Sequence, residues 1–144
     1  MTKKERERQL LPGMPNDVLF AAIEAHNRAY APYSQYAVGA AVMTGSGEVI
    51  AGCNVENASY GLTICAERVA VARAVSDGHR EFKLLVVATA DAAPPCGACL
   101  QFLCEFCEDL DIRLVSRGVP PKLVETRLSA LLPHRFRSAK IRSP

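Results

Sequence analysis

The sequence has little net charge, no long apolar run and few aromatic residues. Its 144 residues carry a formal net charge of +2, and no basic stripe interleaved with aromatics is present, which argues against a nucleic-acid ligand. No apolar stretch is long enough to cross a membrane or to form the core of a signal peptide. We therefore expect a cytoplasmic protein, whose six cysteines are thiols or metal ligands rather than disulfides.

Histidine is also scarce, and repeats and low-complexity tracts are absent. His26, His79 and His134 are scattered, and none occupies a position suited to a metal ligand, so we expect ordinary structural roles for them. The length favours one domain with a proper core. We place it at residues 14–137, after a flexible N-terminal extension (1–13) and before a basic C-terminal tail (138–144). Both charged ends are interpreted as solvated, with an anionic partner as the alternative for the basic one.

Hydrophobic patterns predict an α/β fold. Apolar spacing predicts a helix that starts with Asn16 or Asp17 as N-cap and ends by Pro32. The later elements are helices at 65–76 and 98–109, strands at 36–44, 48–55, 83–90, 112–116 and 123–126, and a helical turn at 129–132. Strands that alternate with helices indicate parallel pairing, and the early hairpin makes the sheet mixed. We expect a three-layer α/β/α fold with about five strands and helices on both faces.

Three cysteines stand at the starts of two predicted helices. Cys96 and Cys99 lie in "PCGACLQ", and Cys65 opens the apolar stretch "TICAERVAVARAV". Zinc prefers thiolate and imidazole ligands in tetrahedral geometry, and three protein ligands leave a fourth position for water. The positive ends of both helix dipoles would help to keep the thiols ionised. The sequence therefore predicts a zinc site with Cys65, Cys96 and Cys99 as ligands.

Two charged residues, Glu67 and Arg68, lie at the start of this otherwise apolar helix, where a buried charge needs a partner. Three thiolates carry more negative charge than zinc offsets, so we expect Arg68 to donate a hydrogen bond to a thiolate and compensate the excess. Glu67 is placed poorly for a fourth ligand but well for the reacting water. We expect it to take a proton from that water and pass it to a leaving group, as in zinc deaminases.

Ordered motifs extend this pattern over residues 16–137. "CAER" and "PCGAC", together with "AYAPYSQYAVGAA", "GCNVENASYG" and "LLPHRF", resemble the small homotetrameric cytidine deaminases that use three cysteines. The resemblance implies one zinc ion per subunit. It also implies hydrolysis of cytidine and deoxycytidine to uridine and deoxyuridine with release of ammonia, as in pyrimidine salvage.

The resemblance also implies substrate contacts. Asn54 and Glu56 occupy the positions at which the family binds the ribose. Tyr36 occupies the position at which an aromatic residue, usually Phe, packs near the nucleoside. The backbone of Ala66 is expected to meet the pyrimidine edge.

Tyr60 and Phe136 match family positions that reach the pocket of a neighbouring subunit. The resemblance therefore implies an active site completed in trans within a homotetramer. Two departures from the family pattern lie beside the metal motif. Pro94 replaces a serine, which removes a backbone hydrogen-bond donor but leaves the backbone carbonyl available to the substrate amino group. Leu100 replaces an arginine, so a contact that the family makes at this helix surface is not expected here.

Three other functions are kept as alternatives. A deaminase of a modified cytosine nucleoside, such as blasticidin S, would share the metal motif but differ in the ribose segment. A polynucleotide-editing deaminase would carry a basic surface. A non-catalytic interaction module stapled by zinc would supply a fourth protein ligand. Cys104 and Cys107 form a second Cys-x-x-Cys pair, which we interpret as small buried residues within a helix rather than as a second metal site.

Overall fold

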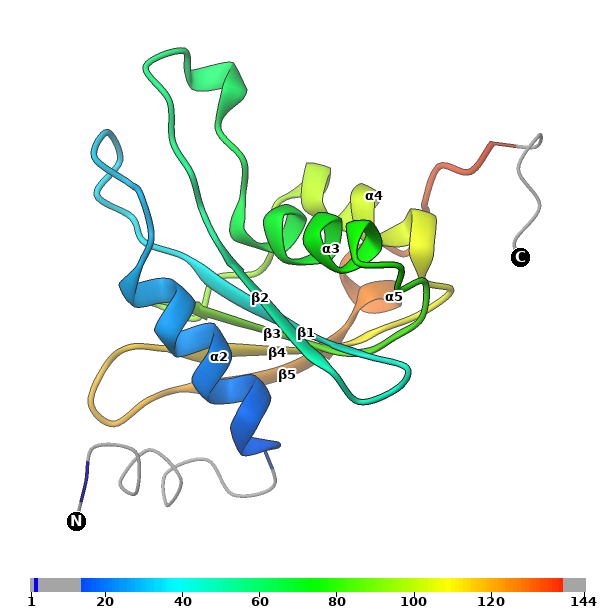
Figure 1. The fold of residues 1–144 in the computed structure, drawn as a ribbon, viewed down its shortest axis with the longest axis horizontal. Helices are drawn as coiled ribbons and strands as arrows, with labels where there is room; N and C mark the ends of the chain where they lie inside the picture. Colours follow the sequence, from blue (N-terminus) through cyan, green and yellow to red (C-terminus); the bar gives the residue numbers. More distant parts are fainter. Residues whose placement is uncertain (1, 3–13, 139–144) are drawn as a thin grey trace.

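The structure is a computed structural model that describes residue 2 and residues 14–138. Apart from Thr2 and Ser138, the predicted N-terminal extension and C-terminal tail lie outside the described residues. The elements are α2 (Asn16–Asn27), β1 (Gly39–Thr44), β2 (Val49–Cys53), η1 (Tyr60–Leu62), α3 (Ala66–Ser76), β3 (Phe82–Thr89), α4 (Gly97–Phe106), β4 (Asp111–Ser116), β5 (Leu123–Arg127) and α5 (Leu128–Leu131) (Figure 1). Within the described part of the chain, no helix has the length and apolar character that a bilayer span requires.

The five strands form one mixed sheet in the order β2-β1-β3-β4-β5. β1 pairs antiparallel with both β2 and β3, β3 pairs parallel with β4, and β5 closes the far edge antiparallel to β4. β2 and β3 therefore run in the same direction with β1 between them, and α3 joins them across one face. The predicted mixed sheet is confirmed, with parallel pairing confined to the β3–β4 pair.

Helices cover both faces of the sheet, which gives the predicted three layers (Figure 1). On one face, Val18, Leu19 and Ala22 of α2 pack with inward residues of β1 and β3 such as Ala41 and Val86. On the other face, buried residues of α3, α4 and α5 pack on the alternate strand positions: Ala66, Ala70, Val71, Leu100, Leu103, Leu128, Ala40, Val42, Leu85, Val87, Ile112 and Leu114. Because successive side chains of β3 face opposite sides, "LLVVA" serves two cores at once.

Two glycines let the helices lie unusually close to the sheet. A Cβ atom at Gly39 would lie 2.1 Å from the carbonyl oxygen of Ala22 in α2. A Cβ atom at Gly52 would lie 2.5 Å from the backbone nitrogen of Ala70 in α3. Gly52 therefore fixes the depth at which α3, and with it the start of that helix, sits on β2.

Two helices end earlier than the sequence predicts. α2 begins after Pro15 without a side-chain cap and stops at Asn27, because the backbone of Tyr30 bonds instead to Asn54 and Glu56. α4 stops at Phe106, and Cys107 is extended, with its carbonyl accepting a hydrogen bond from Arg135.

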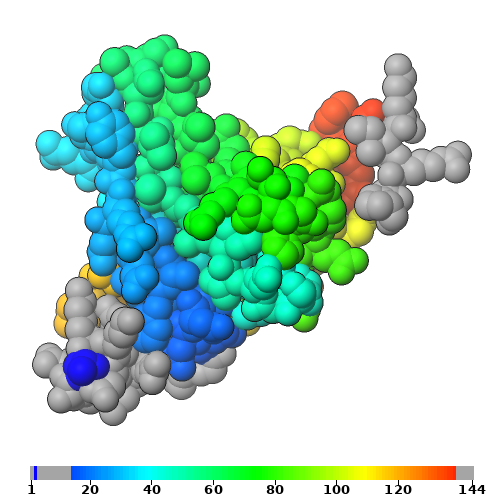
Figure 2. Space-filling view, in the orientation of Figure 1, coloured from blue at the N-terminus to red at the C-terminus, as the bar shows by residue number. Residues whose placement is uncertain are grey.

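Two loops project together from the sheet at the end that carries the start of α3 (Figure 1, Figure 2). They are residues 30–36 and 54–64, which we call the arm. Isolated bridges join Tyr30 to Val55 and Val55 to Ile64 within it. The arm exposes six large apolar or aromatic side chains: Tyr30, Tyr33, Val55, Tyr60, Leu62 and Ile64.

Replacing Gly52 with alanine is expected to lower the free energy of unfolding by about 2–3 kcal/mol, because the new methyl group overlaps the backbone of α3. Chemical denaturation monitored by circular dichroism measures this change. Gly118→Ala is the matched control, since its Cβ would meet only ordinary contacts of 3.7 Å or more, and its cost should stay within about 0.5 kcal/mol. Equal costs for the two substitutions would refute the close packing of α3 on β2.

Candidate metal centre and active site

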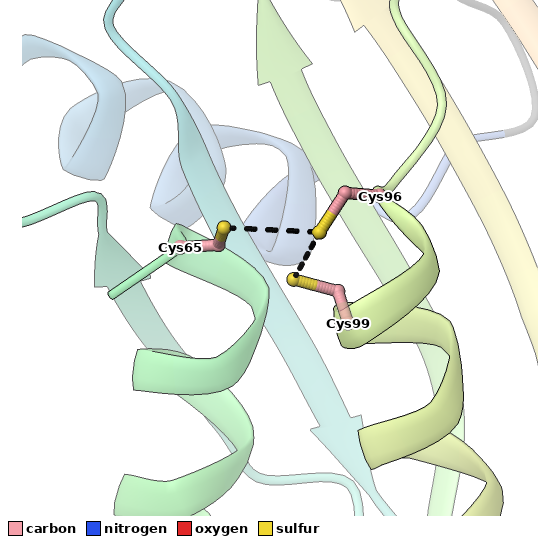
Figure 3. Close-up of side chains that lie close together, drawn as sticks. All are labelled: Cys65, Cys96 and Cys99. Carbon is pink, nitrogen blue, oxygen red and sulfur yellow. Dashed lines mark hydrogen bonds between the residues drawn. The ribbon is translucent and has the colours of Figure 1, made fainter. Parts of the chain in front are cut away.

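Three cysteine thiols meet where the starts of α3 and α4 converge (Figure 3). Cys65 is the residue before α3, Cys96 is the residue before α4, and Cys99 lies in the first turn of α4. The Cys96 sulfur is 3.9 Å from that of Cys65 and 3.5 Å from that of Cys99, and the whole group lies within 4.8 Å. Ligand sulfurs around a tetrahedral zinc ion lie about 3.8 Å apart, since Zn–S bonds are about 2.3 Å. The cluster fits one zinc ion.

The Arg68 guanidinium lies beside the cysteine cluster, where its positive charge can offset the negative charge of the thiolates. Its Nη2 atom donates to the Cys65 sulfur at 3.6 Å, while its buried Nε has no partner among the described residues. Hydrogen bonds from Cys99 and then from Arg68 lower the pKa of Cys65 to about 5, whereas the bond to Cys65 and burial raise the pKa of Cys99. Cys65 is therefore already a thiolate at neutral pH, ready to accept a cation.

Glu67 is buried beside the sulfurs, with 6% of its surface exposed. Its Oε2 atom accepts a hydrogen bond from the Cys99 thiol at 3.8 Å, and burial raises the pKa of its carboxyl group. It does not belong to the three-residue cluster that could hold a metal. A carboxylate at the edge of a metal site with a raised pKa is suited to accept and return a proton.

Within the described part of the chain, the remaining cysteines and the histidines do not form a second metal centre. Among residue 2 and residues 14–138, Cys65, Cys96 and Cys99 make the one group of three or more ligand side chains. Cys104 and Cys107 are both buried, as predicted, although Cys107 follows α4 rather than lying within it. Burial raises the pKa of Cys107 to about 11, so that thiol is unreactive.

Asn54 and Glu56 lie at the base of the arm and hold its backbone. The buried side chain of Asn54 accepts from the Val38 nitrogen and donates to the Tyr36 carbonyl, both at 2.9 Å. Glu56 accepts from the backbone nitrogens of Tyr33 and Ser34 and from the Ser34 hydroxyl, whose hydrogen bonds lower the pKa of its carboxyl group. Each side chain thus organises the loop at residues 30–36.

Tyr36 points from the arm toward the loop that leads to α4. Its hydroxyl donates to Asp91, which the sequence analysis did not single out. Burial and this bond raise the pKa of Tyr36, with smaller contributions from the Asp91 and Glu67 carboxylates. The available signal for Asp91 was a charged residue two positions after the buried strand β3. Ala66 is fully buried as the first residue of α3, directly between Cys65 and Glu67.

The two residues assigned to a neighbouring pocket are both strongly exposed. Tyr60 is 74% exposed and contacts Tyr33 edge-to-face, and Phe136 is 76% exposed, with its carbonyl accepting a hydrogen bond from Gln101. Neither belongs to the cluster of cysteines. Both Nη atoms of Arg137 donate hydrogen bonds to the Glu108 carboxylate just after α4, and this ion pair holds residue 137 against the domain.

The two departures beside the metal motif differ in their surroundings. Pro94 is exposed in the loop before Cys96. Leu100 is buried and packs in the core beneath α3 and α4, so the apolar side chain is accommodated within this chain.

A three-thiol centre with an adjacent buried carboxylate, on a three-layer α/β/α scaffold, defines the class of zinc-dependent deaminases. Residues 15–112 match the family described as the cytidine and deoxycytidylate deaminase zinc-binding region. This match covers more than half of the chain. The chain therefore belongs to the cytidine and deoxycytidylate deaminase family and is an enzyme of the cytidine deaminase type.

Curated relatives and solved structures agree with this assignment. The chain is 44% identical over 117 residues to a cytidine deaminase of Halalkalibacterium halodurans, covering 80% of this chain and 88% of the relative. The crystal structure of cytidine deaminase from Burkholderia pseudomallei superposes with a TM-score of 0.77 at 40% identity, covering 85% of this chain and 99% of that one. A blasticidin-S deaminase of Bacillus cereus is 28% identical over 113 residues, covering 72% of this chain and 79% of the relative.

Replacing Arg68 with alanine is expected to weaken zinc binding by about tenfold, because the Cys65 thiolate loses its cationic partner. Competition for zinc with a chelator of known affinity measures the change. Arg73→Ala on the same helix is the matched control, since Arg73 bonds to the Ala51 carbonyl and not to the cluster, and zinc affinity should be unchanged. Native zinc affinity in Arg68→Ala would show that the guanidinium does not compensate the thiolates.

Proposed function

We propose that this enzyme hydrolyses cytidine and deoxycytidine at C4, giving uridine or deoxyuridine and ammonia. The observation that carries the proposal is the buried Glu67 carboxyl group beside three converging thiols, outside the set of metal ligands. Names of the similar curated proteins support the nucleoside as substrate, since relatives at 43% and 44% identity are cytidine deaminases.

The chemistry divides between the metal and the protein. Bound by Cys65, Cys96 and Cys99, zinc supplies Lewis-acid activation of the attacking water. Glu67 takes the proton of that water and delivers it to N3 of the base as the water oxygen joins C4. The same carboxyl group then carries the proton of the new C4 hydroxyl group to the departing amino group, so that ammonia leaves and the C4 carbonyl of uridine forms. Arg68 offsets the excess negative charge of the thiolates throughout.

Recognition of the nucleoside is assigned to the base of the arm and the start of α3. Asn54 and Glu56 would hold the ribose hydroxyls, Tyr36 would pack near the nucleoside, and the Ala66 backbone would meet the pyrimidine edge. Because the side chains of Asn54 and Glu56 already bond to residues 33–38, each would use its remaining hydrogen-bonding capacity for the sugar. The Pro94 carbonyl would accept from the substrate amino group.

A nucleoside is favoured over the alternative substrates. Greater identity to the cytidine deaminases than to the blasticidin-S deaminase favours the unmodified nucleoside. The near-neutral charge disfavours a polynucleotide. Three rather than four thiol ligands disfavour a purely structural zinc site.

We also propose a homotetramer in the cytoplasm that acts in pyrimidine salvage, with Tyr60 and Phe136 entering a neighbouring subunit's site. The exposed apolar side chains of the arm support burial against another copy. The cysteine cluster supports a reducing compartment, because free thiols are required for metal binding.

Replacing Glu67 with glutamine is expected to reduce turnover of cytidine by about a thousandfold and to leave one zinc ion bound per chain, because only the proton carrier is removed. The loss of cytidine absorbance measures turnover, and metal analysis measures zinc. Glu105→Gln, at an exposed position on α4, is the matched control and should retain native turnover. A Glu67→Gln variant with native turnover would refute the role of this carboxyl group.

A native protein that binds zinc but leaves cytidine and deoxycytidine unchanged would refute the substrate assignment. Turnover of blasticidin S in the same assay would then identify the modified-nucleoside alternative. Absence of turnover with every cytosine nucleoside would favour the zinc-stapled module.

Mixed oligomers test whether Phe136 acts in trans. The Phe136→Ala and Glu67→Gln proteins should each be impaired when assayed separately. When equal amounts of the two are refolded together, about one quarter of the sites should combine an intact Glu67 with a neighbour's intact Phe136 and regain activity. Turnover of cytidine by the mixture, compared with the sum of the separate variants, measures this recovery. Activity no greater than that sum would place Phe136 in its own subunit's site or outside it.

A further inference from the structure

The Tyr36 side chain lies between two segments that are far apart in sequence. On the side of the arm, its backbone nitrogen donates to the Ser34 hydroxyl oxygen at 3.0 Å, and the Ser34 hydroxyl donates to Glu56. The Tyr36 carbonyl accepts from the Asn54 amide at 2.9 Å. Tyr36 is therefore fixed by both of the residues assigned to the sugar.

On the other side, Tyr36 reaches the turn that follows β3. Its hydroxyl donates to Asp91 Oδ1, which also accepts from the Thr89 hydroxyl at 3.3 Å. The Thr89 oxygen in turn accepts from the Ala93 backbone nitrogen at 3.1 Å. The turn places Ala92 in the left-handed region with φ of 58°, a conformation that costs a non-glycine residue free energy and needs support from its surroundings.

This supported turn leads directly to the metal ligands. Four residues lie between Asp91 and Cys96, and two of them, Pro94 and Pro95, limit the backbone freedom of the connection. A change in the position of Asp91 is therefore transmitted to Cys96, which is the exposed member of the cluster and directly follows this turn and its two prolines.

We propose that the Tyr36–Asp91 hydrogen bond is a positioning contact that couples the arm to the turn leading to Cys96. It would thereby keep the metal ligands correctly placed relative to the substrate. Its effect on zinc is independent of the proposed function, whereas its effect on turnover rests on it. Neither Tyr36 nor Asp91 would touch the metal, and Asp91 is new to the site.

The charges favour this bond at neutral pH. The bond from Tyr36 lowers the pKa of Asp91, while burial and the same bond raise the pKa of Tyr36. The pair therefore remains a neutral hydroxyl donating to a carboxylate, which is the stronger kind of hydrogen bond. The phenylalanine usual in the resembling family would retain the ring and remove this donor.

The test measures zinc transfer from the zinc-loaded protein to a chromogenic chelator. Tyr36→Phe is expected to release zinc about fivefold faster than the native protein, because Cys96 is less well held. Asp91→Ala should release it at least as fast, and the double variant should match Asp91→Ala alone, because both substitutions remove the same contact. Far-ultraviolet circular dichroism and the melting temperature establish that each variant is folded.

Tyr30→Phe is the matched control, since it removes a hydroxyl from the same arm for which the described part of the chain offers no hydrogen-bond partner. Its zinc release should equal that of the native protein. A native release rate in Tyr36→Phe would overturn the proposal, and so would effects of Tyr36→Phe and Asp91→Ala that multiply in the double variant.

Kinetics with cytidine separate this proposal from the proposed function. We expect kcat of Tyr36→Phe to fall about fivefold while KM changes less than about twofold, because the ring that packs near the nucleoside remains. A higher KM for cytidine together with a native rate of zinc release in Tyr36→Phe would assign Tyr36 to substrate binding alone. That result would overturn the coupling. A native protein without turnover would refute the proposed function, and the zinc-transfer result would still decide the coupling.

Discussion

Three cysteine sulfurs lie within 4.8 Å of one another, and as metal-binding thiolates they would repel, so the surrounding structure offsets that repulsion in several ways. The positive ends of α3 and α4 point at the sulfurs, and Arg68 adds a full positive charge beside Cys65. Gly52 sets how deeply α3 lies on the sheet, and the shared core of α3 and α4 keeps the two helix starts together. The zinc ion completes this balance, so metal binding and the packing of these helices are linked.

The same convergence explains how one carboxyl group acquires its chemistry. Glu67 lies one helical residue beyond the buried Ala66, so the backbone that presents Cys65 also carries the proton acceptor into the apolar interior. The pKa of Glu67 rises because of this burial. A raised pKa suits a proton carrier that must both accept and return a proton, because it strengthens the carboxylate as a base.

The sequence predicted the chemistry more completely than the contacts that organise it. Cys65, Cys96 and Cys99 were identifiable because thiolates at two helix starts suit one metal, and the continuous apolar run of β3 predicted a strand covered on both faces. The end of α2 at Asn27 was not predictable, because it depends on hydrogen bonds from the arm to Tyr30. Asp91 was missed for a similar reason: its partner Tyr36 is 55 residues away in sequence. Long-range pairing of this kind leaves no local periodicity. The roles of Asn54, Glu56, Tyr60 and Phe136 rest on the family resemblance.

The central claim is that water replaces the amino group of the base within this site. Incubation of cytidine with the zinc-loaded enzyme in water enriched in heavy oxygen, followed by mass spectrometry of the product, tests it directly. The expected product is uridine that carries one heavy oxygen atom at C4 of the pyrimidine ring, formed together with an equal amount of ammonia. Uridine without the heavy isotope, or unchanged cytidine in the presence of fully zinc-loaded enzyme, would contradict it.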